Sequence, residues 1–219
     1  MQKKIDEDEN ITVVSDEIDD LIIENNRCLG VITRDGTDYQ ASSVVITTGT
    51  FLKGVMHIGL SSTEGGRVGE KSSTKLSETF YRHFKVGRLK TGTPPRIDSQ
   101  TIDYDTLIIQ PGDPEWLHFS FQTTYNESYK HQIPCYLTET NEETHSIILK
   151  NLDRSPMYTD VIKGQGPRYC PSIEDKIVRF KHNPSHHIFI EPEGRNTNWI
   201  YPQGLNTSLP KDVQEAVLK

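Results

Sequence analysis

The sequence has few cysteines, and that scarcity narrows the possible classes of protein. It contains three, Cys28, Cys135 and Cys170, with irregular spacing and no C-x-x-C pair. A sparse, odd set argues against a disulfide framework and against a cysteine zinc site. We therefore expect a protein of a reducing compartment, and we predict a cytoplasmic location.

Long apolar runs are also missing, since apolar residues make up 33% of the 219 residues. No stretch reaches the roughly 18 apolar residues that a membrane helix needs. Residues 1–10 are charged and lack the apolar core of a signal peptide. We expect a soluble protein with no membrane association, long enough for one large domain or two small ones.

The net charge of −7 by itself disfavours nucleic-acid binding, but the charge is unevenly distributed. Residues 1–24 hold nine acids against two lysines, whereas residues 67–96 hold eight Lys and Arg against two Glu, a local net charge of +6. Clustering matters for phosphate contact because screening confines each charge to about 8–10 Å. The pattern leaves two readings open, a solvated basic face and a nucleic-acid contact.

The first fifty residues predict a β-meander followed by a buried strand. Asn-Asn and Asp-Gly turn signals separate β-prone runs at residues 17–24, 28–33 and 38–41. The continuous apolar run 43–48 is typical of a buried strand. It ends at Gly49, where the missing Cβ lets a ligand approach the backbone, although an ordinary strand-to-loop turn has the same pattern.

Later segments alternate between predicted helices and extended chain. Residues 86–97 contain two glycines and a Pro-Pro pair, so they predict an extended basic segment and not a helix. The other predicted elements are helices over residues 72–84, 141–152 and 208–218, beginning near Ser72 or Ser73, Asn141 and Ser208, and strands over 187–191 and 199–201.

Residues 164–180, GQGPRYCPSIEDKIVRF, carry the clearest candidate chemistry. A Gly-Pro loop precedes a helix predicted to begin at Pro171 or Ser172. Ser172 and Asp175 fit a capping box, while Pro171 also fits the first helical position with Cys170 as the cap. The predicted apolar stripe comprises Ile173, Ile177 and Phe180 or Val178. The predicted polar faces comprise Glu174, Asp175, Lys176 and Arg179.

Cys170 directly precedes this predicted helix and lies two residues after Arg168. A helix N-terminus and a neighbouring arginine both favour the thiolate, although Glu174 and Asp175 oppose it in part. Tyr169 has an aromatic ring that can stack on a base or a flavin. The competing interpretation is a small buried cysteine with no chemical role.

These strings resemble the GidA/MnmG family, and the resemblance extends from about residue 11 to the C-terminus. Beside GPRYCPSIEDKIVRF, the matching strings are TTGTFLKGVMHIGL (47–60), GGRVGE (65–70), VGRLKTGTPPRID (86–98), QIPCYLT (132–138), NLDRSPMY (151–158), EPEG (191–194) and YPQGLNTSLP (201–210). Strings of this length do not arise by chance.

The resemblance implies a mixed α/β fold, part of a two-dinucleotide-binding FAD/NAD(P) fold with an inserted α+β domain. It implies a partial FAD-binding domain over residues 1–95, an inserted domain over 96–170 and a return to the FAD-binding domain over 171–219. The implied enzyme uses FAD and NADH, works with the GTPase MnmE, and is a homodimer at full length. It adds a (carboxymethyl)aminomethyl group to C5 of the wobble uridine in tRNA, with methylenetetrahydrofolate as the one-carbon donor.

By this resemblance Cys170 is the catalytic thiol. The implied cofactor contacts are Ile18, Thr48, Gly49, Thr50, Ser73, Gly166, Pro167, Arg168, Tyr169, Cys170, Pro171, Ser172, Ile173, Glu174, Asp175, Lys176, Ile177, Val178, Arg179 and Phe180. The basic candidates for tRNA contact are Arg82, Lys85, Arg88, Lys90 and Arg96. No metal ligand is expected, because His186 and His187 are adjacent and do not easily face one ion together with His182.

The sequence departs from the family in lacking its Gly-rich FAD fingerprint, the cysteine that the family pairs with the one matching Cys170, the C-terminal flavin motif and the helical domain that meets MnmE. Glycine backbone and helix N-termini supply most pyrophosphate binding. We therefore expect this chain alone to bind FAD weakly or not at all and to be inactive.

Three alternatives stay open. The chain is a non-catalytic module that binds tRNA or a partner, or it is part of a folate- and FAD-dependent tRNA uridine-C5 methyltransferase. The third alternative is a structural fragment whose function exists only in the parent protein.

Overall fold

The structure, a computed structural model, describes residues 2–115, 117–118, 120–122, 130–162, 164 and 171–219. It contains two compact units. The N-terminal unit comprises Met1–Met56 and Ser62–Val86, and the C-terminal unit comprises His57–Ser61 and Gly87–Lys219. Mixed helices and strands confirm the predicted α/β class, whereas the three predicted domain ranges stay a prediction.

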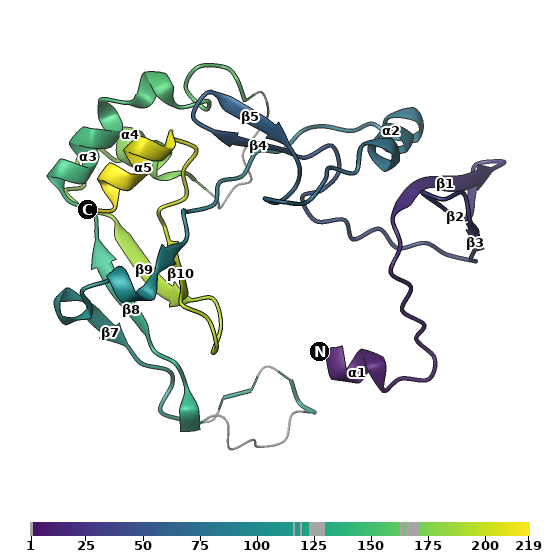
Figure 1. Ribbon diagram of the computed structural model, residues 1–219, viewed down its shortest axis with the longest axis horizontal. Coiled ribbons are helices and arrows are strands. Elements are labelled where there is room, and N and C mark those ends of the chain that lie inside the picture. Colours follow the sequence, from purple (N-terminus) through teal and green to yellow (C-terminus); the bar gives the residue numbers. More distant parts are fainter. Residues whose placement is uncertain (1, 116, 119, 123–129, 163, 165–170) are drawn as a thin grey trace. The chain divides into compact units, whose positions relative to one another are not determined.

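An antiparallel sheet in the order β1-β2-β3 forms much of the N-terminal unit (Figure 1). Asn25 and Asn26 have positive φ values of 48° and 63°, which confirms the predicted tight turn between β1 and β2. The elements of this unit are α1 (Gln2–Asp6), β1 (Ile18–Glu24), β2 (Arg27–Thr33), β3 (Asp38–Gln40) and α2 (Thr74–His83).

Helix α2 packs against β1 and is joined to it by ion pairs. Lys75 Nζ lies 2.6 Å from Asp19 Oδ2, and Arg82 Nη2 lies 2.8 Å from Asp20 Oδ2. Asp19 is buried, so its pairing with Lys75 offsets the cost of removing a carboxylate from water. The predicted helix over residues 72–84 is thereby confirmed, with Ser73 at its N-cap.

The predicted buried strand over residues 43–48 is wrong for this structure. The segment is irregular, and Val45 is 84% exposed. A buried strand needs hydrogen-bonding neighbours, and no strand in the described part of the chain pairs with this one. The apolar run indicates a tendency to be buried, but it does not provide a neighbouring strand with which residues 43–48 could pair.

A five-stranded antiparallel sheet in the order β6-β10-β9-β8-β7 is the centre of the C-terminal unit. Its strands are β6 (Ile97–Asp98), β7 (Ile108–Gln110), β8 (Cys135–Glu139), β9 (His187–Pro192) and β10 (Trp199–Gln203). The helices are α3 (Glu142–Leu149), α4 (Ile173–Arg179) and α5 (Lys211–Val217), with 3₁₀ turns at Ser99–Thr101, Tyr104–Thr106 and Leu152–Arg154. Strands β4 (Val55–Ile58) and β5 (Ser61–Glu64) form a separate hairpin.

Helices α3, α4 and α5 pack with β9 and β10 around one core. Its buried residues are Ile148, Ile173, Ile177, Ile188, Ile190, Ile200, Leu205, Leu209 and Val213. Ile188 and Ile190 alternate with the exposed Phe189, as expected for a strand with one covered face. The predicted strands near residues 187–191 and 199–201 are confirmed.

The helix starts explain why these short helices form. The Asn141 side chain accepts a hydrogen bond from Thr144 N at 2.9 Å, as predicted for the N-cap of α3. Helix α5 begins instead at Lys211 with Pro210 as its cap, so Ser208 is not the cap that we predicted. Ser208 is buried in the preceding loop.

Among the described residues, no helix combines the length and the apolar character that a membrane crossing requires.

Two histidines stack beside this core. The ring centroids of His145 and His186 lie 5.4 Å apart, and Thr140 Oγ1 bonds His145 Nε2 at 2.8 Å. Burial lowers the pKa of both rings, and the nearby positive charges of His145 and Lys176 lower the pKa of His186 further. The folded state therefore favours the neutral rings.

We predict that acid weakens the fold through this pair. Because both pKa values lie below the ordinary 6.5, the unfolded chain binds more protons, and the free energy of unfolding falls as the pH drops below about 6.5. Urea denaturation at several pH values measures this. The double substitution His145→Gln with His186→Gln should flatten the pH dependence, while the exposed control His182→Gln should not. Identical slopes in all three proteins would contradict the prediction.

A second prediction concerns the core. Ile148 is fully buried, so Ile148→Ala should lower the free energy of unfolding by about 2–5 kcal/mol. The adjacent Leu149 is 47% exposed, and Leu149→Ala should cost about 0.5 kcal/mol or less. Equal losses in urea denaturation would show that Ile148 does not lie in the core.

Candidate functional site

The predicted catalytic residue Cys170 lies outside the described residues, together with Gly166, Pro167, Arg168 and Tyr169. The described part of this segment is Gly164 and the run from Pro171 to Phe180. Its roles in cofactor binding stay a prediction. The structure does describe the residues that directly follow Cys170 in the chain.

The first turn of α4, which follows Cys170 in the chain, is held by two hydrogen bonds. Ser172 Oγ accepts a hydrogen bond from Asp175 N at 3.1 Å, which confirms the predicted Ser172 cap. Ile173 N donates to Asn206 O at 2.7 Å. Ile173 and Ile177 are buried in the core, as predicted. The helix start is therefore attached both to its own cap and to a distant loop.

Glu174, which was predicted among the polar positions that face away from the apolar stripe of α4, is buried, at 0% exposure. Its Oε1 accepts hydrogen bonds from Thr207 Oγ1 at 2.9 Å and from Ser208 N at 3.3 Å. Burial raises the pKa of this carboxyl. The helix buries two faces, one against the core and one against the loop of residues 206–208, which we call the Asn-Thr-Ser loop.

The far end of α4 also differs from the prediction. Phe180 is 51% exposed and does not extend the apolar stripe, because the helix ends at Arg179. Lys176 Nζ donates to Gly204 O at 3.3 Å, just before the Asn-Thr-Ser loop. Burial lowers the pKa of Lys176. Lys176, which was predicted among the polar positions of the helix, therefore also links α4 to the chain before the Asn-Thr-Ser loop.

Two further segments meet the Asn-Thr-Ser loop. Thr207 N donates to Thr93 O of the basic segment at 3.4 Å. Gly59 N, at the tip of the β4–β5 hairpin, donates to Ser208 O at 2.7 Å. The family-like strings 47–60 and 86–98 thus both contact the Asn-Thr-Ser loop, and this loop, which belongs to the string 201–210, binds the start of α4.

The string 151–158 contacts helices α4 and α5. Tyr158 Oη donates to Asp175 Oδ1 at 3.3 Å, and burial together with Asp175 raises the pKa of Tyr158 to about 12. Arg154 forms a bidentate pair with Asp212 of α5, with both N···O distances at 2.9 Å. Tyr158 stays protonated near neutral pH and acts there as a hydrogen-bond donor.

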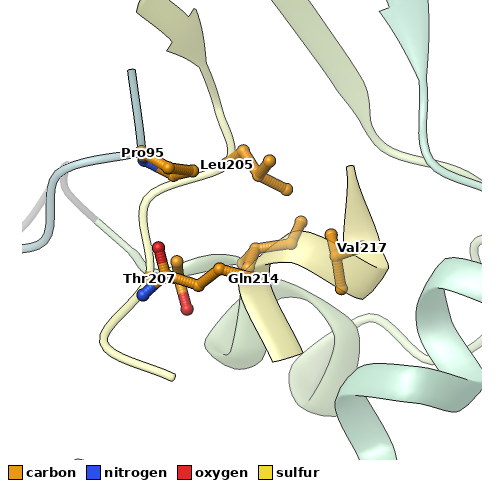
Figure 2. A pocket seen from close by; sticks show the side chains of 6 residues that line it. Pro95, Leu205, Thr207, Gln214 and Val217 are labelled. Carbon is orange, nitrogen blue, oxygen red and sulfur yellow. The ribbon is translucent and has the colours of Figure 1, made fainter. Parts of the chain in front are cut away.

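The cavities near this cluster differ in what they can hold. One pocket, of about 10 Å³, is lined by Pro95, Ile173, Leu205, Thr207, Gln214 and Val217. Figure 2 labels all of these side chains except Ile173. That volume suits one water molecule and no cofactor. A hollow of about 620 Å³ between α3 and the end of α4 is of ligand size, but of those predicted cofactor residues that the structure describes, only Ile177 lines it.

The other predicted cofactor residues belong to the N-terminal unit. Gly49 has a φ of 57° and nothing within 4 Å of where a Cβ would stand, so its backbone is open to approach. Thr50 Oγ1 donates to Gly66 O at 3.2 Å, and Ser73 N donates to Phe51 O at 2.9 Å. The turn of residues 48–51 is thereby joined to the start of α2. Ile18 lies at the start of β1, half-buried.

The five basic candidates for tRNA contact divide between the units. Arg82 and Lys85 lie in the N-terminal unit, and Arg88, Lys90 and Arg96 lie in the C-terminal unit. Arg82 pairs with Asp20, whereas Arg96 Nε lies 2.6 Å from Glu193 Oε1 and its guanidinium covers the Tyr201 ring at 4.5 Å. Both of these guanidinium groups therefore already have a carboxylate partner.

The described cysteines are Cys28 and Cys135, and the surroundings of Cys135 disfavour a reactive thiol. Burial raises the pKa of Cys135, with Glu191 adding to the effect, and that disfavours its thiolate. Cys28 Sγ contacts Gly30 O at 3.6 Å. Within the described ranges, no group of three His, Cys, Asp or Glu side chains is arranged to bind a metal ion.

Sequence reasoning missed the role of the Asn-Thr-Ser loop and the burial of Glu174. One available signal was the position of the three polar residues between Leu205 and Leu209, which are both buried. A polar string between two core residues is drawn into the interior, where it needs hydrogen-bond partners. Glu174 in helix α4 supplies one hydrogen-bond acceptor for this string.

Known proteins resemble this chain over nearly its whole length. The family model described as glucose inhibited division protein A matches residues 1–219. GidA of Aquifex aeolicus is similar in two crystal forms. Form I has 47% identity and a TM-score of 0.85, covering 97% of this chain and 36% of that chain. Form II has 44% identity and a TM-score of 0.84, covering 97% and 34%.

The chain therefore spans about a third of the length of the GidA chains that it matches, at 36% and 34%. Both the match to the family over all 219 residues and the identity to a solved member lead to one conclusion: this chain belongs to the glucose-inhibited division protein A (GidA) family.

Proposed function

We propose that this chain is the central part of an FAD- and NADH-dependent enzyme that modifies C5 of the wobble uridine in tRNA. The modification is a (carboxymethyl)aminomethyl group, the one-carbon unit comes from methylenetetrahydrofolate, and the GTPase MnmE is the partner. The observation that carries the proposal is that family-like strings meet at the Asn-Thr-Ser loop, which binds the start of α4 directly after Cys170. Such rigid support is what a reactive segment requires.

Cys170 is the proposed nucleophile. After its thiol loses a proton to solvent, the sulfur bonds to C6 of uracil, and the displaced π electrons make C5 nucleophilic. Arg168 is proposed to favour the thiolate or to contact a phosphate, and Tyr169 is proposed to stack on a base. Because a wobble base already lies in a loop, exposing it is less costly than extracting a base from a duplex.

The residues present fit part of an FAD site. The backbone at Gly49 is open to approach, and Thr48 and Thr50 flank it. Ser73 lies at the start of α2 with its backbone bonded to Phe51 and Lys53, so its hydroxyl is the group that it can offer to a cofactor. We propose these residues, with Ile18 and residues 166–180, as the cofactor contacts. FAD supplies the redox chemistry when bound, and the protein orients it.

Contact with tRNA is proposed for the basic residues Arg82, Lys85, Arg88, Lys90 and Arg96. Arg82 and Arg96 already pair with Asp20 and Glu193, so a phosphate would have to compete with these carboxylates. We also propose that the full-length protein is a homodimer.

Cys170→Ser in the full-length protein should abolish the modification, because a hydroxyl at that position is a far weaker nucleophile. The measurement is mass spectrometry of tRNA nucleosides. Cys135→Ser is the matched control and should leave the modification near the parent level. If Cys170→Ser retains the modified nucleoside, Cys170 is not the nucleophile. Detection of 5-methyluridine instead would favour the methyltransferase alternative.

We also predict that the 219-residue chain by itself retains little flavin. The sequence has no G-x-G-x-x-G string, so the backbone donors that usually bind the pyrophosphate are missing. The visible absorption spectrum of the purified chain after incubation with FAD and gel filtration is the measurement. A stoichiometric flavin band after gel filtration would contradict the prediction.

A further inference from the structure

The hollow of about 620 Å³ between α3 and the chain that follows α4, which we call the α3–α4 hollow, is of a size that takes a small organic molecule. One side of it is a single face of α3 and its C-cap, because the lining residues there repeat at the period of a helix. The other lining residues are Ile177 of α4 and residues 181–184. The whole hollow belongs to the C-terminal unit.

The charge around the α3–α4 hollow is mainly positive. Lys150 and Lys181 line it, and both are exposed. Within the described part of the chain, neither ammonium group has an ion-pair partner. Among the described lining residues, Glu142 is the only acid. In a chain whose net charge is −7, these two lysines give this hollow a local attraction for anions.

Further basic groups lie behind the lining. His145 lines the hollow, and its ring stacks on that of His186 at 5.4 Å between centroids. His186 Nε2 is buried without a hydrogen-bond partner among the described residues. Burial lowers the pKa of His186, and the positive charges of His145 and Lys176 lower it further. An anion in the hollow would relieve this repulsion between basic groups.

The remaining lining indicates that the anion has an apolar, flat part. Leu149, Ile177 and Pro184 supply apolar surface. The imidazole rings of His145 and His182 supply flat faces, on which a nucleic-acid base can stack. Lysine ammonium groups are point charges that bind phosphate. An inorganic ion would leave the apolar surface uncovered, and an uncharged apolar molecule would leave the lysines without a partner.

We propose that the α3–α4 hollow binds one nucleotide unit, with its phosphate held by Lys150 and Lys181 and its base packed on the imidazole rings and the apolar side chains. A free mononucleotide and an exposed nucleotide of single-stranded RNA present this same chemistry. The site uses neither Cys170 nor any of the five basic residues proposed for tRNA contact, so it stands or falls separately from the proposed function.

The test measures the binding of uridine monophosphate to the full 219-residue chain by isothermal titration calorimetry at low salt. Lys150→Gln and Lys181→Gln should each weaken binding by roughly 3- to 10-fold, and the double variant should weaken it more. Lys211→Gln is the matched control, because Lys211 does not line the hollow and its side chain is 83% exposed. It should leave the Kd unchanged. Unaltered melting temperatures, expected for exposed positions, show that the variants fold.

Proton NMR of the histidine rings locates the ligand. Uridine monophosphate should shift the signals of His145 and His182, assigned by substitution to Gln, and leave that of His83 in α2 in place. Absence of binding, an unchanged Kd in the double lysine variant, or unshifted His145 and His182 signals would each overturn the proposal.

Two further probes identify the ligand's source. Inorganic phosphate that binds as tightly as uridine monophosphate would overturn the assignment of a nucleotide, because the base would then contribute nothing. Octauridylate, an unstructured RNA, distinguishes the two sources: tighter binding than the mononucleotide assigns the site to single-stranded RNA. Equal or weaker binding assigns it to the free nucleotide.

Discussion

Attachment of the first turn of α4 to the Asn-Thr-Ser loop is the constraint on which the rest of the C-terminal unit depends. A helix of seven residues is too short to be stable by propensity alone. It forms here because Ser172 caps it, Ile173 and Ile177 anchor it in the core, and the loop binds its start. The loop's polar groups, being buried, need those same partners.

Much of the fold was predictable because local signals agreed with the tertiary structure. The Asn25-Asn26 turn, the Asn141 cap and the Ser172 cap each depend on chemistry within a few residues, and all three were confirmed. Residues 43–48 were predicted wrongly because a strand depends on a neighbour, and periodicity carries no information about that neighbour.

The candidate site was predictable in its location along the chain but not in its internal contacts. Family-like strings identified the start of α4, yet they did not reveal that Glu174 faces inward or that Phe180 faces solvent. Both facts depend on where α4 ends and on a loop about thirty residues later, which is a tertiary effect. The pairing of Arg82 with Asp20, 62 residues apart, was equally inaccessible.

Gly59 has a consequence for how this sequence can vary. Its φ is 57°, and an added Cβ would lie 2.8 Å from Cγ of Pro210, so the hairpin tip reaches the C-terminal loop only because one carbon atom is missing. Any larger side chain would force the tip away and break the Gly59 N to Ser208 O bond. The residue types at Gly59 and Pro210 therefore constrain each other, although about 150 residues separate them in the sequence.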